Sequence, residues 1–173
     1  YLCADNVAKM CGPRMNGCTL ISVGSQGDFS FENAFHERFP QSTVTVLDGT
    51  VSAQVVSSAP SHIQFVHKNF GPRTWKAVRR REVDVLKIDC EGCEYDSLLQ
   101  WIRHVCTAQV LMEVHAPIVS FWDNKRYTML PRIDRFLLEL NKTHAVFFAE
   151  PNIITAAEGV FIEYSFQIRT PCE

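Results

Sequence analysis

Short apolar runs rich in β-branched residues recur along the chain and predict buried strands. The clearest run opens the stretch Val83–Glu94, which ends in a cluster of acids around one glycine. Apolar residues then continue at helical spacing through Leu98, Leu99 and Ile102, so we interpret the stretch as strand, loop and helix. The predicted strands are Thr19–Val23, Thr43–Leu47, Ile63–His67, Val83–Ile88, Gln109–His115, Ala145–Phe148 and Val160–Ile168.

Helices are predicted between several of these strands. Phe31, Phe35 and Phe39 recur at four-residue spacing, as on one face of a helix. Besides the helix after the central strand, the predicted helices are Tyr1–Met10, Phe29–Phe39, Thr74–Arg81 and Met129–Leu140. The last two strands have no helix between them, so they should pair antiparallel at one edge. The prediction is an α/β fold: a doubly wound, mostly parallel seven-stranded sheet with one antiparallel edge strand.

Composition fits a single domain over residues 1–173, with an N-terminal helix and loop at 1–18 and the sheet core at 19–168. A chain of 173 residues that is 46% hydrophobic can bury a sizeable core. The net charge of -2 argues against electrostatic binding of nucleic acid over a broad surface, so no nucleic-acid partner is expected. No apolar stretch approaches the roughly twenty residues needed to cross a bilayer, so no membrane span is expected in this chain.

The cysteines bear on the compartment. Three of the seven fall in the first eighteen residues, where a short disulfide-clipped segment would suit an oxidising environment. Asn141 begins a glycosylation sequon, which agrees with a luminal or secreted location. The sequence therefore favours the secretory pathway lumen or secretion, with the cytoplasm as the alternative.

The loop after the first strand has the properties of a nucleotide-cofactor site. Gly24 and Gly27 allow the backbone to approach a ligand closely, and the following helix offers free N–H groups. About twenty residues later, Asp48 ends the second strand, where a carboxylate can accept hydrogen bonds from ribose hydroxyls. The loop lacks the three-glycine dinucleotide fingerprint, which counts against a pyrophosphate cofactor. A tight turn without a ligand is the structural alternative.

The acids of the central stretch should lie beside this loop, because the carboxyl ends of parallel strands face the ligand crevice of an open α/β sheet. Asp89 and Glu91 follow the central strand, and Glu113 and His115 end the next one. The crevice is therefore predicted to combine a glycine loop with several carboxylates and the imidazoles of His67 and His115.

At these residues the sequence resembles a family. The block Lys87–Glu94 is similar to the Lys-Ile-Asp-Val-Glu-Gly-Ala-Glu block of the FkbM-type S-adenosylmethionine-dependent methyltransferases, including their animal methyltransferase-like relatives. The similarity spans about Thr19 to Ile168. Two positions depart from the pattern: Ser22 stands where many relatives have an acid, and Asp48-Gly49 replaces the more usual Glu-Pro.

The resemblance implies a class I methyltransferase sheet that binds S-adenosylmethionine. It implies that Gly24, Ser25 and Gly27 lie against the methionine part of the cofactor. It also implies that Asp48 binds the ribose and that Asp89 lies near the methionine amino group.

Methyl transfer from a sulfonium is an in-line displacement, so the enzyme mainly has to position donor and acceptor. A hydroxyl acceptor also needs a base to remove its proton. His115 is the first candidate because its ordinary pKa suits neutral pH, and Glu91 and Glu113 are the next two. The structural alternatives are a hydrogen-bonded histidine at a strand end and, for Glu91 and Glu94, stabilisation of the following helix.

Cys90 and Cys93 form a C-x-x-C motif at a predicted helix start, which could indicate redox chemistry. We disfavour this, because each cysteine stands where relatives carry a small apolar residue. A divalent metal on Asp89, Glu91 and His115 is chemically possible, but no metal is expected.

The sequence thus predicts a S-adenosylmethionine-dependent methyltransferase that methylates oxygen on a small-molecule, sugar-like or glycan acceptor. The segment Ala116–Thr128 is interpreted as a substrate-covering loop. Two alternatives remain open: an inactive paralogue that keeps the sheet as a binding module, and a nicotinamide-dependent oxidoreductase.

Overall fold

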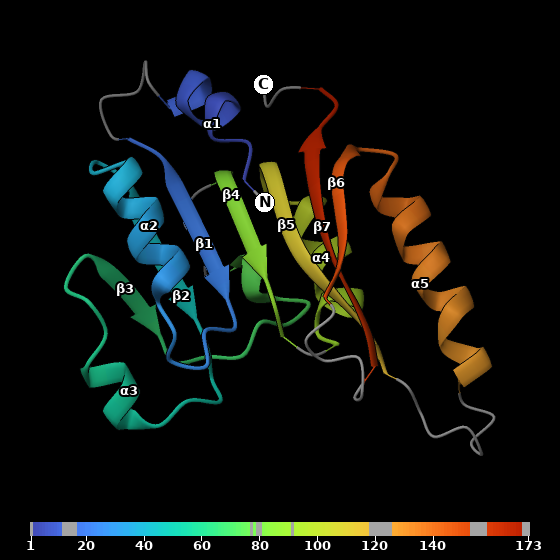
Figure 1. The fold of residues 1–173 in the computed structure, drawn as a ribbon, viewed down its shortest axis with the longest axis horizontal. Coiled ribbons are helices and arrows are strands. Elements are labelled where there is room, and N and C mark those ends of the chain that lie inside the picture. Colours follow the sequence, from blue (N-terminus) through green and yellow to red (C-terminus); the bar gives the residue numbers. More distant parts are fainter. Residues whose placement is uncertain are drawn as a thin grey trace.

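One sheet of seven strands organises the molecule, in the order β3-β2-β1-β4-β5-β7-β6 (Figure 1). The computed structural model describes residues 2–11, 17–76, 78, 81–90, 92–117, 126–152 and 159–170. The strands are β1 (Thr19–Val23), β2 (Thr43–Leu47), β3 (Ile63–Val66), β4 (Glu82–Ile88), β5 (Cys106–Pro117), β6 (His144–Asn152) and β7 (Gly159–Ile168). The helices are α1 (Ala4–Cys11), α2 (Ser30–Arg38), α3 (Ala53–Ser57), α4 (Glu94–Ile102) and α5 (Arg126–Leu140), with a 3₁₀ turn η1 (Thr74–Lys76).

Strands β1 to β5 pair in parallel, and β7 pairs antiparallel with both β5 and β6. The predicted sheet, mostly parallel with antiparallel pairing at one edge, is confirmed. The reversed strand β7 lies between β5 and β6, so β6 forms the edge.

Each face of the sheet carries its own apolar core, because successive strand residues point to opposite sides. Val85 packs with the core under α1 and α2, whereas its neighbour Leu86 packs with the core under α4 and α5. Figure 1 shows α2 in front of the sheet and α4 behind it. The continuous apolar run of β4 follows from this burial on both faces.

One helix prediction needs correction, and one helix was not predicted. The described residues of the segment Thr74–Arg81 form the η1 turn and not the predicted α-helix, with bonds such as Lys76 N–H to the Arg73 carbonyl at 3.0 Å. The Trp75 ring stacks on His104 with centroids 3.8 Å apart, which holds this turn against the end of α4. Helix α3 was not predicted, and the Ser52 hydroxyl caps it by accepting from the Val55 N–H.

The N-terminal segment is joined to the sheet. The predicted disulfide clip is present as Cys11–Cys18. The side-chain amide of buried Gln109 on β5 also accepts from the Cys3 N–H and donates to the Cys3 carbonyl. In the part of the chain that the structure describes, no helix has the length and apolar character needed to traverse a bilayer.

Candidate active site

A cavity of about 500 Å³ lies at the carboxyl ends of β1, β2 and β4, the lower edge of the sheet in Figure 1. Parallel α/β sheets place their ligand crevices at this edge. The cavity is lined by Val23, Gly24, Gln26, Leu47, Asp48, Gly49, Thr50, Asn69, Phe70, Asp89, Cys90 and Cys93. Its walls combine apolar side chains with carboxylates and loop backbone, which suits a ligand that has an aromatic ring and a polar chain.

The glycine loop, which begins at Gly24, packs closely against the end of β4. Gly24 has φ +76°, and a β-carbon there would lie 1.7 Å from the Asp89 carbonyl oxygen. Gly24 donates its N–H to the Leu47 carbonyl at 3.0 Å and accepts from the Lys87 ammonium at 3.3 Å. The position therefore needs glycine for both its backbone angle and its close packing. The loop is held in place by contacts with β2 and β4.

Asp48 organises this loop from the end of β2. Its carboxylate accepts from the Ser25 and Gln26 N–H groups, both at 2.9 Å, and from the Ser25 hydroxyl at 3.2 Å. It also accepts from the N–H and the hydroxyl of Thr50. Burial raises the pKa of Asp48, but these bonds outweigh it and hold the pKa well below its usual range. Asp48 lines the cavity as predicted, yet one of its oxygens already accepts from the glycine loop and the other from Thr50, so ribose binding would share them.

Asp89, Glu113 and Glu94 surround His115. The His115 Nε2 lies 3.2 Å from a Glu113 oxygen and 3.6 Å from an Asp89 oxygen, and Nδ1 lies 3.4 Å from Glu94. The Glu94 side chain is fully buried, whereas that of Asp89 is 40% exposed. The structure therefore brings together three of the predicted site residues, Asp89, Glu113 and His115, at the ends of β4 and β5.

The charge of His115 follows from these neighbours. Burial alone lowers the pKa of His115, but the hydrogen bond and charge of Glu94, with the charges of Glu113 and Asp89, raise it above its ordinary value. The imidazole therefore holds its proton near neutral pH more firmly than a free histidine does. This favours ion pairing over general-base action by the first of the predicted bases.

Glu94, the first residue of α4, also holds the loop that precedes the helix. Its carboxylate accepts from the Gly92 N–H at 2.8 Å and from the His115 N–H at 3.3 Å. The Tyr95 hydroxyl donates to the His115 carbonyl at 2.7 Å. The end of β5 is therefore fixed by two consecutive residues of α4.

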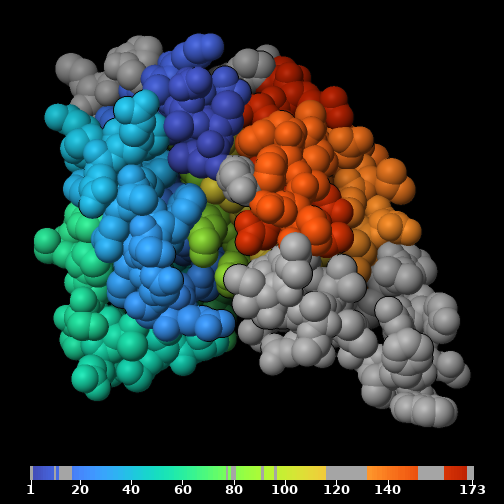
Figure 2. All heavy atoms as spheres, in the orientation of Figure 1, coloured from blue at the N-terminus to red at the C-terminus, as the bar shows by residue number. Residues whose placement is uncertain are grey.

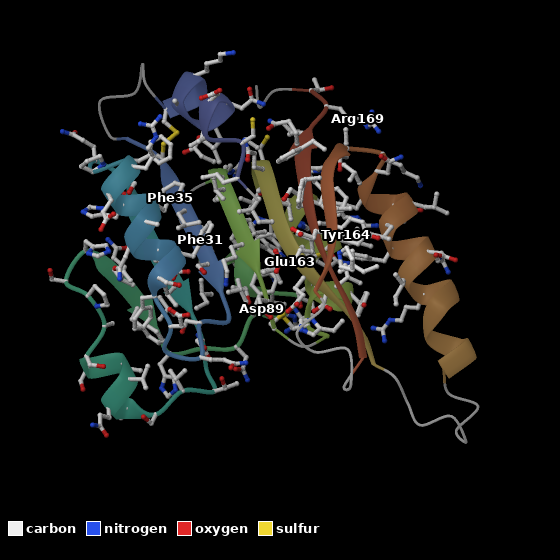
Figure 3. All side chains as sticks on the ribbon, in the orientation of Figure 1. Phe31, Phe35, Asp89, Glu163, Tyr164 and Arg169 are labelled. Carbon is white, nitrogen blue, oxygen red and sulfur yellow. A yellow bond between two sulfur atoms is a disulfide. The ribbon has the colours of Figure 1, made fainter. Side chains whose placement is uncertain are left out.

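A second, smaller cavity of about 190 Å³ opens beside this cluster. Figure 2 shows the surface hollowed between α2 and the strands β6 and β7, where atoms of β4 are visible. Figure 3 shows Asp89 near the lower end of this region and Phe31, Glu163 and Tyr164 along it. The cavity is lined by Phe31, Lys87, Ile88, Asp89, Leu111, Met112, Glu113, Glu163 and Tyr164. Asp89 borders both cavities, so the two meet at the end of β4.

Cys90 and Cys93 are joined by a disulfide bond. Both side chains pack against the apolar core, as expected at positions where relatives carry a small apolar residue. The bond between the two cysteines was not predicted. Cys106 is also disulfide-bonded, and among the described cysteines Cys3 is free.

Among the described residues, two groups of side chains have metal-ligand spacing: Asp89, Glu113 and His115, and Cys90, Cys93 and Glu94. The disulfide leaves the second group without thiolates. The first group acts as an ion-paired cluster in this structure, and the expectation of no metal stays a prediction.

Several site residues were not predicted. Lys87 holds the glycine loop, and Phe31 and Tyr164 line the smaller cavity. The Ser22 hydroxyl donates to buried Glu32 of α2, so a carboxylate does lie beside the position where relatives carry an acid. No sequence signal locates these contacts, because the sheet brings together residues far apart in the chain.

Two predicted features cannot be placed. Glu91 lies outside the described residues. So does most of the segment Ala116–Thr128.

Comparison with solved structures supports the fold. An N-methyltransferase, NodS from Bradyrhizobium japonicum WM9 in complex with S-adenosyl-L-homocysteine, aligns at TM-score 0.55 and 10% identity, covering 96% of this chain and 86% of that one. The fibrillarin pre-rRNA processing protein of Methanococcus jannaschii aligns at TM-score 0.62 and 7% identity, covering 90% and 68%. A putative O-methyltransferase from Klebsiella pneumoniae aligns at TM-score 0.60 and 10% identity, covering 88% and 73%. No curated protein sequence matches the chain.

The sheet order, the glycine loop and the cavity at the strand ends define a Rossmann-like class I methyltransferase architecture. The chain belongs to the family described as "Methyltransferase domain", whose sequence profile matches residues 72–167, more than half of the chain. The predicted enzyme class, a methyltransferase, and the predicted cofactor, S-adenosylmethionine, are thereby confirmed.

Proposed function

We propose that the protein is an FkbM-type O-methyltransferase that acts on a hydroxyl group of a small, sugar-like acceptor. The observation that carries the proposal is the meeting of the two cavities at Asp89. The larger cavity, of about 500 Å³, lies in the size range of cofactor pockets, whereas the smaller one, of about 190 Å³, lies below that range and limits the acceptor to a small group. A ligand in each would place donor and acceptor side by side at the ends of β4 and β5.

The lining of the smaller cavity suits a polyhydroxylated ring. Phe31 and Tyr164 offer apolar faces against which the C–H groups of a sugar ring can pack. Glu113 and Glu163 offer carboxylate oxygens that accept from hydroxyls, and Lys87 offers a donor. A flat hydrophobic acceptor would cover these polar groups without hydrogen-bonding to them, so the chemistry favours an acceptor with several hydroxyls.

S-adenosylmethionine, when bound, supplies an activated methyl group on a sulfonium. The protein must orient the acceptor oxygen and take its proton. Glu113 is placed to do this, because it lines the smaller cavity and lies 3.2 Å from His115. His115, as an imidazolium, balances the charges of Glu113, Asp89 and Glu94 and holds the first two in position. We therefore place Glu113 ahead of His115 as the base, with Glu91 third.

The FkbM-type assignment is supported by the roles of the block Lys87–Glu94. Lys87 binds the glycine loop, Asp89 borders both cavities, and Glu94 braces the loop before α4. The proposed location is the secretory pathway lumen or the exterior. The bonds Cys11–Cys18 and Cys90–Cys93 support it, because disulfides persist in oxidising compartments.

The test measures methyl transfer from labelled S-adenosylmethionine to monosaccharides and glycans, to amines and to RNA. We expect transfer to a hydroxyl of a sugar-like acceptor.

Glu113→Gln should lower kcat by roughly 10²–10⁴-fold and change the S-adenosylhomocysteine affinity by less than about threefold. Glu139→Gln, on the outer surface of α5, is the matched control and should keep full activity. Transfer to amines or RNA alone would contradict the acceptor class, and full activity of the Glu113 variant would exclude it as the base. Binding of the cofactor without transfer to any acceptor would favour the inactive paralogue.

A further inference from the structure

The Cys90–Cys93 disulfide forms part of the wall of the cofactor cavity. Both cysteines line that cavity together with Gly24, Asp48 and Asp89. Cys90 directly follows Asp89, the residue that borders both cavities. The disulfide is therefore part of the site, unlike the Cys11–Cys18 bond, which lies among the buried residues under α1 and α2.

Among the described residues of the loop between β4 and α4, a few hydrogen bonds accompany the disulfide. Its start is fixed by the Asp89 N–H, which donates to the Val23 carbonyl at 3.0 Å. Within the loop, the Cys93 N–H donates to the Cys90 carbonyl at 3.4 Å, and the Gly92 N–H donates to Glu94 at 2.8 Å. Gly92 has φ +106°, and a β-carbon added there would meet no atom within 4 Å, so side-chain packing at that position adds no restraint. The disulfide is the covalent tie that closes this turn.

We propose that the Cys90–Cys93 disulfide is a positioning element of the cofactor site, and that its reduction by a dithiol weakens cofactor binding. In the reaction, the dithiol gives two electrons and two protons, the bond between the two cysteine sulfurs breaks, and the reductant becomes a cyclic disulfide. The inference rests on the proposal that the larger cavity is the cofactor site.

The reduced loop gains an alternative hydrogen bond. The Cys90 sulfur lies 3.6 Å from the Glu94 oxygen that accepts from the Gly92 N–H. A thiol at Cys90 can donate to this oxygen and compete with Gly92. Cys93 is then held in the cavity wall only by its apolar packing and backbone bonds, because its covalent bond to Cys90 is gone and its side chain makes no cap bond to α4. Ordering the loop again on binding costs conformational entropy, which lowers the affinity.

The test is calorimetric titration of S-adenosylhomocysteine into the oxidised protein and into the protein reduced with dithiothreitol, with the thiol state checked by alkylation. We expect the Kd of the reduced form to be at least about tenfold higher. The paired variant Cys90→Ala/Cys93→Ala should bind like the reduced wild type and should not respond to dithiothreitol. The matched control Cys11→Ala/Cys18→Ala should keep the response, because its lost bond is remote from the cavity.

A second measurement on the wild type needs no variant. Coupling between two sites is reciprocal, so saturating S-adenosylhomocysteine should make the Cys90–Cys93 disulfide harder to reduce. A tenfold difference in Kd corresponds to a shift of about 30 mV in its reduction potential. A bond that only stabilised the fold would change the melting temperature but neither the Kd nor this potential.

Equal Kd values for the oxidised and reduced forms, with no shift in potential, would overturn the inference. Failure of the oxidised protein to bind S-adenosylhomocysteine would instead overturn the assignment of the cofactor site.

Discussion

The role of Asp48 can be tested by replacing its carboxylate with an amide. Asp48→Asn keeps one accepting oxygen but replaces the other with an NH₂ group. This NH₂ group would face N–H donors that bind a carboxylate oxygen in the wild type. If the remaining oxygen serves Ser25 and Gln26, the Thr50 N–H loses its acceptor. A hydrogen bond to a charged group contributes about 1.5–3 kcal/mol, and the retained bonds lose their charge assistance. We expect a loss of roughly 2–4 kcal/mol in unfolding free energy.

Urea unfolding measures this loss. With an m-value of about 2 kcal/mol/M, the midpoint should fall by roughly 1–2 M at pH 7. Because the pKa of folded Asp48 is depressed, its stabilisation is complete above the unfolded pKa and is lost as pH falls toward the folded value. The difference between wild type and variant should therefore shrink by about 1 kcal/mol at pH 3.

Asp28→Asn is the control for this measurement. Asp28 lies in the same loop but is exposed, and it accepts from Ser30 outside the cavity. We expect no measurable shift of its midpoint. An unchanged midpoint for Asp48→Asn, or a difference that does not depend on pH, would refute the role given to this carboxylate.

Two further variants test residues that lie against Asp89 at the end of β4. The pKa of His115 is raised in the folded state, so its stabilisation should be present below about pH 6.5 and lost as pH rises through the folded pKa. The unfolding free energies of wild type and His115→Gln, measured in urea, should differ more at pH 6 than at pH 9. A larger difference at pH 9 would contradict the claim that a protonated His115 stabilises the fold. Gly24→Ala should cost at least about 2 kcal/mol, because its β-carbon would meet the Asp89 carbonyl and its φ is positive. Gly71→Ala, whose β-carbon would meet its nearest atom at 4.0 Å, is the matched control, and equal losses would rule out the close packing.

Most of the fold could be predicted because a strand that is buried on both faces of the sheet has a continuous apolar sequence. The strand Val83–Ile88 is apolar throughout since Val85 and Leu86 enter different cores. The glycine loop was also recognisable from the sequence, because Gly24 has a positive φ angle that other residues rarely adopt. The helix predicted at Thr74–Arg81 was wrong because periodicity cannot show that the chain must turn before β4 begins at Glu82.

The site was less predictable, because its contacts depend on geometry between elements. Asp48 was recognisable as an acid at a strand end, but the sequence could not show that Thr50 and the glycine loop occupy its oxygens. The pKa of His115 depends on Glu94, which the helix start turns toward the end of β5. The partner of Cys90 likewise became clear only when the loop geometry placed Cys93 beside it.

The central claim is that the cavity bordered by Gly24, Asp48 and Asp89 binds S-adenosylmethionine. Calorimetry on the oxidised wild-type protein with S-adenosylmethionine, S-adenosylhomocysteine and NAD tests it most directly. We expect saturable binding of the first two ligands at one shared site, and no binding of NAD. Binding of NAD alone, or of none of the three, would contradict the account.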